Sequence, residues 1–316
     1  MADYLAPDLD GADIRDRVEA NGLELAYEQF GHDDDPALLL IMGLGTQLTG
    51  WPDAFCRALA DTGLRVIRFD NRDIGLSTKM RSAQAYDGPR QAFFKSVLNR
   101  TIEAPYTLED MAADTVGLMD ALGIRRAHLV GASMGGMIAQ LVAALYPERT
   151  RTLTSIMSSS GARGLPRGKL KVLMRLGKPP KNNRLETVTR HMAQTMRMIG
   201  SPQYGRSLED WMSEIRRNVR RSYYPPGTRR QMLAVMAAPS RVDLLGGITC
   251  PALVIHGKAD PLIPVRHGRD TADCLANADY EEIDGMGHDL PPRLLPLFVT
   301  RIARLAHAAD APSIPD

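Results

Sequence analysis

Cysteines are scarce in this 316-residue sequence. The three present, Cys56, Cys250 and Cys274, stand far apart and form no C-x-x-C pair. An odd number of isolated cysteines excludes a disulfide framework and predicts buried structural thiols in a reducing compartment. The sequence also lacks the spacing of Cys, His, Asp and Glu that is typical of a metal site, so we expect neither a metal nor another cofactor.

Long apolar runs are also missing. No run approaches the roughly 18 residues that suggest a membrane-spanning helix, so we expect none. Contact with a membrane is not our main expectation, and docking of the basic segment 161–240 on lipid is an alternative. The opening residues, MADYLAPDLDGADIRD, are acidic and lack the basic and then apolar pattern of a secretion signal. Hydrophobic residues make up 44% and charged residues 24%, which is typical of a globular protein. These features predict a cytoplasmic protein of one large domain or two.

The net charge of only +2 conceals an uneven distribution of charge. Residues 161–240 hold 17 Lys and Arg against 4 Asp and Glu, together with 7 of the 16 methionines. The remainder of the chain is acidic, with 22 basic and 33 acidic residues. The aromatics among these cations are too few for a nucleic-acid surface (Tyr204, Trp211, Tyr223 and Tyr224). The segment therefore predicts a distinct inserted unit, and we do not expect nucleic acid as a partner.

The rest of the chain alternates between strand and helix patterns. Asn21-Gly22 joins two alternating runs, which is a strong signal for a β-hairpin. A short, continuously apolar run at 37–43 predicts a strand buried on both faces, and 64–70 predicts a second such strand. Further strands are predicted at 127–133, 151–159, 251–257 and 279–285. Apolar residues at helical spacing predict helices at 51–63, 106–124 (behind a Thr107 cap), 134–147 and 291–308. We expect an α/β fold with a mostly parallel central sheet and helices on both faces.

Residues 161–240 interrupt this alternation with several predicted helices. One apolar stripe has helical spacing, and Gly200-Ser201-Pro202 ends it (Leu185, Val188, Met192, Met196 and Ile199). We therefore expect a core formed by residues 1–160 and 241–316, with 161–240 as a helical cap over one edge of the sheet. The apolar helices of such a cap are also a possible surface for homodimerisation.

The stretch LVGASMGGMIAQ suggests a reactive serine. Gly131, Ser133 and Gly135 spell G-x-S-x-G between a predicted strand and a predicted helix. A nucleophilic serine on such a turn needs small neighbours, because a side chain there would collide with the adjacent backbone. Met134 would begin the helix and aim its N–H at the reacting site. A chain of this length contains the pattern by chance about one time in ten, so the serine needs partners elsewhere.

Two further residues could complete the chemistry. Asp260, in VIHGKADPLIP, and His288, in IDGMGHDL, each follow a predicted strand. In an open α/β sheet, functional groups gather beyond the carboxyl ends of the strands. The imidazole could take the proton of Ser133 while the carboxylate holds its tautomer. The order Ser, Asp, His along the chain is that of an α/β-hydrolase. His256, at the end of a predicted strand, is expected to have a structural role.

The loop after the first parallel strand should supply a second donor to an oxyanion. The N–H of Leu44 is our candidate, because Gly43 and Gly45 on either side allow the backbone to approach a substrate closely. Trp51 and His191 are candidates for lining the substrate pocket. The methionine-rich cap would add an adaptable apolar wall suited to a small apolar or a bulky ester.

With these motifs in order, the chain resembles the α/β-hydrolase superfamily over nearly its whole length, least within the cap. Within it, the chain is similar to the aclacinomycin methylesterase type of serine esterases, which cleave a carboxyl methyl ester from an anthracycline. The segments that carry the resemblance are IMG, GWPDAFCRALADTGLRVIRFDNRD, GASMGG, HGKADPLIP and IDGMGH. The resemblance implies that Ser133, Asp260 and His288 form a triad, and that Leu44 and Met134 form an oxyanion hole.

The sequence departs from many hydrolases at two places. Met42-Gly43 stands where many have His-Gly, and Asp73 replaces a glycine of the D-x-R-G-x-G-x-S loop. Both departures are shared with the methylesterase type, and they argue against transferring the specificity of His-Gly lipases to this chain.

The motifs together predict a carboxylic ester hydrolase that works through an acyl-enzyme intermediate. Hydrolysis of a lactone, an amide or a carbon–carbon bond by the same three residues is the main alternative. A ligand receptor that retains the hydrolase shell is a second alternative, although a receptor has no need of all three residues.

Overall fold

The computed structural model describes residues 14–80, 86–88, 91, 92, 94, 95, 98 and 100–311. Its centre is an eight-stranded sheet in the order β1-β2-β4-β3-β5-β6-β7-β8. The strands are β1 (Ile14–Ala20), β2 (Leu23–Phe30), β3 (Ala37–Ile41), β4 (Arg65–Phe69), β5 (Ala127–Ala132), β6 (Thr150–Ile156), β7 (Ala252–Gly257) and β8 (Ala278–Ile283). Strand β2 pairs antiparallel with β1 and β4, while β4, β3, β5, β6, β7 and β8 pair in parallel. The predicted hairpin and the mostly parallel sheet are confirmed.

Strand β3, near the centre of the sheet, is apolar throughout because both of its faces are covered. In β3 every residue is buried, and alternate side chains point to opposite faces of the sheet. Leu39 and Ile41 belong to one core cluster, whereas Leu38 and Leu40 belong to the other. The continuous apolar run therefore reflects two cores, one on each side of the sheet.

Helices form the two outer layers. They are α1 (Asp53–Ala60), α3 (Leu108–Ala121), α4 (Met134–Leu145), α9 (Val242–Gly246), α10 (Arg266–Asp273) and α11 (Leu295–Asp310). Short 3₁₀ turns lie at Leu48–Gly50, Pro147–Arg149 and Pro292–Leu294. Apolar side chains of α3, α4 and α9 join one core, and those of α1 and α11 join the other. The predicted cap at Thr107 is confirmed as a capping box with Asp110.

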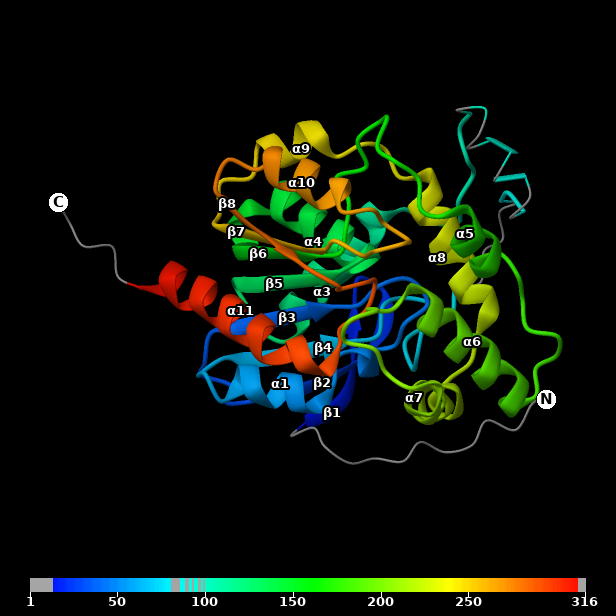
Figure 1. Ribbon diagram of the computed structural model, residues 1–316. Coiled ribbons are helices and arrows are strands. Elements are labelled where there is room, and N and C mark those ends of the chain that lie inside the picture. Colours follow the sequence, from blue (N-terminus) through cyan, green and yellow to red (C-terminus); the bar gives the residue numbers. More distant parts are fainter. Residues whose placement is uncertain are drawn as a thin grey trace.

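Four helices lie between β6 and α9 in the sequence. They are α5 (Leu170–Leu176), α6 (Leu185–Ile199), α7 (Leu208–Arg221) and α8 (Pro225–Ala237), and they gather at one end of the sheet (Figure 1). Helix α6 ends at Ile199, directly before the predicted stop, and its Met192 and Met196 pack against a cluster around Trp211 on α7. The helical content of this segment agrees with the expected cap, while the domain boundaries at residues 160 and 240 stay a prediction.

None of the helices in the described ranges is long and apolar enough to cross a membrane. All three cysteines are free thiols; Cys56 is buried, whereas Cys250 and Cys274 are partly buried.

Candidate active site

Ser133 lies on a tight turn between β5 and α4. Its backbone has φ +56° and ψ −119°, a conformation that is costly for a residue with a side chain. The flanking glycines explain how the turn is built. A Cβ atom on Gly131 would lie 2.1 Å from the carbonyl oxygen of Gly135, and one on Gly135 would lie 2.0 Å from that of Ile41. The turn therefore packs backbone against backbone, and the partly exposed serine stands at its apex.

Asp260, His288 and Ser133 form a hydrogen-bonded chain, although they lie far apart in the sequence. The Nδ1 of His288 lies 2.7 Å from Oδ2 of Asp260, and its Nε2 lies 3.0 Å from Oγ of Ser133. The three residues follow β7, β8 and β5 respectively, at the carboxyl ends of parallel strands. With Nδ1 protonated, Nε2 is left to accept the serine proton, which is the geometry of general-base activation.

The surroundings of Asp260 keep its carboxylate ionised. Burial alone would raise its pKa, but His288 and His256 beside it hold the pKa well below its usual range. Its Oδ1 also accepts hydrogen bonds from the N–H groups of Leu262 and Ile263, at 2.8 and 2.9 Å. A fixed, charged carboxylate can orient the imidazole and stabilise it when it is protonated.

His256 contacts Asp260 and not Ser133. It is fully buried, and its Nε2 lies 2.8 Å from the carbonyl oxygen of Ile263 and 3.5 Å from Oδ2 of Asp260. These contacts fit the structural role that the sequence suggests for this residue.

The two N–H groups that the sequence suggests as oxyanion donors belong to Leu44 and Met134. Gly43 lies against the serine, since a Cβ on it would be 3.1 Å from Cβ of Ser133. In the described part of the chain, the N–H groups of Leu44 and Met134 have no hydrogen-bond partner. The N–H of Gly45, in contrast, donates to Oε1 of Gln231 on α8 at 2.9 Å. This bond holds the loop to α8 directly beside Leu44.

The two remaining sequence candidates lie elsewhere. Trp51 is fully buried, stacks on Phe55 with ring centroids 5.6 Å apart, and belongs to the core beneath α1 and α11. An indole of that size fills the core, so Trp51 is not a substrate contact, contrary to the expectation from the sequence. His191 is partly buried on α6, and its carbonyl accepts a hydrogen bond from Arg175 of α5. Neither residue lines the two cavities described next.

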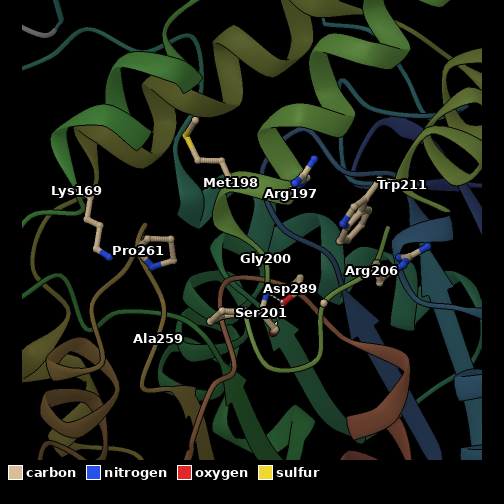
Figure 2. A pocket seen from close by; sticks show the side chains of 12 residues that line it. Lys169, Arg197, Met198, Gly200, Ser201, Arg206, Trp211, Ala259, Pro261 and Asp289 are labelled. Carbon is tan, nitrogen blue, oxygen red and sulfur yellow. Dashed lines mark hydrogen bonds between the residues drawn. The ribbon is translucent and has the colours of Figure 1, made fainter. Parts of the chain in front are cut away.

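Two cavities lie between the cap helices and the core. The smaller, of about 120 Å³, is bounded by the loop after β3 and by α6, α7 and α8, and its lining includes Gly45, Met192, Met196 and Tyr224. The larger, of about 360 Å³, borders the loops that carry Asp260 and His288 (Figure 2). Its lining includes Ser201, Pro261 and Asp289. The larger cavity thus adjoins the loops of Asp260 and His288, and the smaller one adjoins the loop of Leu44.

Ion pairs fasten the cap helices to the loop after β4, and sequence reasoning missed them. Arg221, at the end of α7, lies 2.7 Å from the fully buried carboxylate of Asp70. Arg230 on α8 pairs with both oxygens of Asp73, which has φ +74°. The one signal in the sequence was Asp73 itself, an acidic residue where many hydrolases have glycine. Its partner could not be identified without the fold.

No group of three or more His, Cys, Asp and Glu residues in the described ranges is arranged to hold a metal ion.

Comparison with known proteins places this geometry among related hydrolases. The chain is 31% identical over 298 residues to "Rhodomycin D methylesterase DauP" of Streptomyces sp. (strain C5), covering 87% of this chain and 92% of that protein. It is 29% identical over 293 residues to a 2-hydroxy-6-oxononadienedioate/2-hydroxy-6-oxononatrienedioate hydrolase of Burkholderia vietnamiensis, covering 86% and 87%. Among solved structures, the enol-lactonase from Burkholderia xenovorans LB400 superposes with a TM-score of 0.71 at 24% identity, over 92% of this chain and 100% of that one.

The family model described as the alpha/beta hydrolase fold matches residues 36–291. This range includes all six strands from β3 to β8, the four cap helices and the loops that carry Ser133, Asp260 and His288. The resemblance inferred from the motifs is confirmed, and the chain belongs to the α/β-hydrolase fold family.

Proposed function

We propose that this protein is a serine esterase that cleaves a carboxylic ester through an acyl-enzyme intermediate. The observation that carries the proposal is the hydrogen-bonded series Asp260–His288–Ser133, with the serine on a glycine-flanked turn. In the first step, Nε2 of His288 takes the hydroxyl proton while Oγ of Ser133 attacks the acyl carbon. The protonated imidazole is stabilised by the ionised Asp260.

The tetrahedral intermediate needs donors for its oxyanion. The N–H groups of Leu44 and Met134 are assigned this role, because Met134 directly follows Ser133, Leu44 follows the Gly43 that lies against it, and neither N–H has another partner in the described part of the chain. Met134 is also the first residue of α4, where the helix dipole favours negative charge. Each such donor typically contributes about 10²–10³ in kcat. Gly43 leaves space for the substrate to approach.

The second half of the cycle reverses these roles. His288 gives its proton to the departing alcohol, and the ester carbonyl remains bound to Ser133 as an acyl group. His288 then activates a water molecule, which attacks the acyl carbon, and the acid leaves as the serine recovers its proton. Every proton transfer passes through Nε2 of His288, so the chemistry needs no cofactor.

An ester is the preferred substrate class because the two methylesterase relatives are 30 and 31% identical to this chain over most of its length. Their names refer to rhodomycin D, so a methyl ester on a bulky ring system is one substrate to test first. Carbon–carbon bond hydrolysis by the same three residues is the second candidate. It keeps a place beside the ester because the Burkholderia vietnamiensis relative, at 29% identity, is named as a hydrolase of oxo acids and not of an ester.

The test is turnover of a panel of p-nitrophenyl esters, methyl esters, a lactone, an anilide and a carbon–carbon bond substrate. We expect ester hydrolysis to be fastest, and we expect Ser133→Ala to lower it by about 10³-fold or more without changing the fold. Stoichiometric labelling of Ser133 by a fluorophosphonate would support a nucleophilic serine. A folded wild-type protein that is not labelled would favour a receptor, and undiminished turnover by Ser133→Ala would refute the mechanism.

A further inference from the structure

The loop that carries His288 is held by the segment that follows cap helix α6. The N–H of His288 donates to the carbonyl oxygen of Ile199, the last residue of α6, at 2.7 Å. The N–H of Gly287 donates to Oγ of Ser201 at 2.8 Å. Two consecutive N–H groups at the catalytic histidine therefore bond to the cap and not to the core.

Ser201 also contacts Asp289, on the other side of His288. The N–H of Ser201 donates to Oδ1 of Asp289 at 2.9 Å, and its hydroxyl donates to the same oxygen. Figure 2 shows the two side chains together at the wall of the larger cavity. Their exposed fractions are only 3% and 6%, and burial raises the pKa of Asp289. The serine hydroxyl thus accepts from one neighbour of His288 and donates to the other.

The two segments approach as closely as backbones can. A Cβ atom on Gly287 would lie 2.5 Å from the carbonyl carbon of Gly200, which is too close for any side chain at this position. No side chain separates the segments, so a displacement of residues 199–201 is passed directly to residues 287–289.

The core fixes only part of the same loop. The carbonyl of Met286 accepts a hydrogen bond from the N–H of Ala259 at 3.0 Å, and Asp260 holds Nδ1 of the imidazole. These contacts anchor the start of the loop and one edge of the ring. The N–H groups between them, at Gly287 and His288, donate their hydrogen bonds to the cap segment.

Helix α6 also lines the smaller cavity, through Met192 and Met196. A substrate in that cavity would contact the same helix whose last residue accepts the His288 N–H. The position of α6 therefore links the cavity to the candidate base.

We propose that Ser201 and Asp289 are positioning residues for His288, so that the seating of α6 sets the alignment of His288 with Ser133. The proposal rests on the proposed role of His288 as the general base. Loss of the Ser201 hydroxyl would leave the Gly287 N–H without its partner and Oδ1 of Asp289 with only the Ser201 N–H, and the imidazole would lose its fixed distance to Ser133. Small misplacements of a reacting group can cost up to about 10²-fold in rate.

The experiment compares Ser201→Ala with Ser207→Ala. Ser207 is a matched control, because its hydroxyl also accepts a backbone N–H and pairs with an aspartate, Asp210, but at the start of α7 and at the surface. For Ser201→Ala we expect kcat on the best ester to fall about 10- to 100-fold with KM changed less than about twofold. The rate of fluorophosphonate labelling of Ser133 should fall in parallel, and Ser207→Ala should change neither. Ser201→Thr, which keeps the hydroxyl, should recover most of the rate.

A spectroscopic measurement separates this proposal from the esterase proposal. The Nδ1 proton that His288 shares with Asp260 should give a downfield proton resonance in the wild type, whatever the substrate. We expect Ser201→Ala to broaden or shift that resonance and Ser207→Ala to leave it in place. If Ser201→Ala matches Ser207→Ala in labelling rate and in resonance, the positioning role is wrong while the esterase proposal stands. If the wild type hydrolyses no ester but the resonance responds as expected, the esterase proposal fails alone.

Discussion

The guanidinium of Arg230 donates to both carboxylate oxygens of Asp73, at 2.8 and 2.6 Å, and so joins α8 to the loop after β4. Both side chains are buried, and the hydroxyl of Tyr106 and the N–H of Met80 donate to the same carboxylate, each at 2.8 Å. Asp73 holds the left-handed backbone conformation (φ +74°) that usually selects glycine. The ion pair offers a physical reason for an aspartate at a position where glycine would be unstrained.

Removing one partner of this pair should be costly. In Arg230→Met the charge of Asp73 stays buried without its counter-ion, and we expect the free energy of unfolding to fall by about 3–5 kcal/mol. Urea denaturation of the wild type and the variant at neutral pH measures this difference.

The double variant Asp73→Gly/Arg230→Met is the control for this prediction. It removes both charges and relieves the left-handed backbone, so its stability should recover most of the loss. A double variant as unstable as Arg230→Met alone would mean that the unpaired charge is not the main cost, and that packing of the arginine stem and the lost bonds from Tyr106 and Met80 are.

Local patterns were sufficient for the sheet and for the three residues of the hydrogen-bonded series. A strand buried on both faces needs a continuous apolar run, and the run before Ser133 fixed both its strand and the turn that follows it. Because parallel strands end at the same edge of the sheet, residues after β5, β7 and β8 could be expected to meet there. The residues that could be placed were those whose position depends on strand ends.

Contacts between the cap and the core could not be predicted in this way. Ser201 and Asp289 are 88 positions apart, and nothing in the pattern of either segment indicates that they pair.

For Trp51, in contrast, the sequence suggested a contact that the structure does not show. Its position near the oxyanion loop suggested a pocket wall, but the chain turns between Gly43 and Trp51 so that the indole enters the core beside Phe55. Such outcomes depend on the packing of whole elements.

The low pKa of Asp260 makes a prediction about both activity and stability. In Asp260→Asn the imidazole loses the charge that holds its tautomer, and we expect kcat to fall about 10⁴-fold. The pKa of Asp260 is lower in the folded than in the unfolded protein, so its ionised form stabilises the fold above the ordinary value of 3.8. That contribution is lost as pH falls below about 4 toward the folded-state pKa.

Unfolding free energies measured at several pH values between neutrality and about 3 test this sign. The wild type should exceed Asp260→Asn in stability at neutral pH, and the gap should narrow below about pH 4. A gap that widens as pH falls would show that burial of the carboxylate, and not its bonds to His288 and His256, controls the pKa.

The turn at Ser133 predicts different outcomes for two glycine-to-alanine changes. In Gly135→Ala the new Cβ would lie 2.0 Å from the carbonyl oxygen of Ile41, so β3 and α4 must separate. Overpacking of this kind typically costs about 1–3 kcal/mol or more, and the shift would also move Met134 and Ser133.

Gly246, at the end of α9, provides the matched control. No atom lies within 4 Å of the position that its Cβ would take, and its φ is not positive. Gly246→Ala should therefore leave stability unchanged or raise it by up to about 1 kcal/mol. Urea denaturation, together with fluorophosphonate labelling of Ser133, measures both effects. Equal stability and equal labelling of the two variants would show that β3 and α4 can yield at the turn, and that the serine does not depend on the close packing of Gly135.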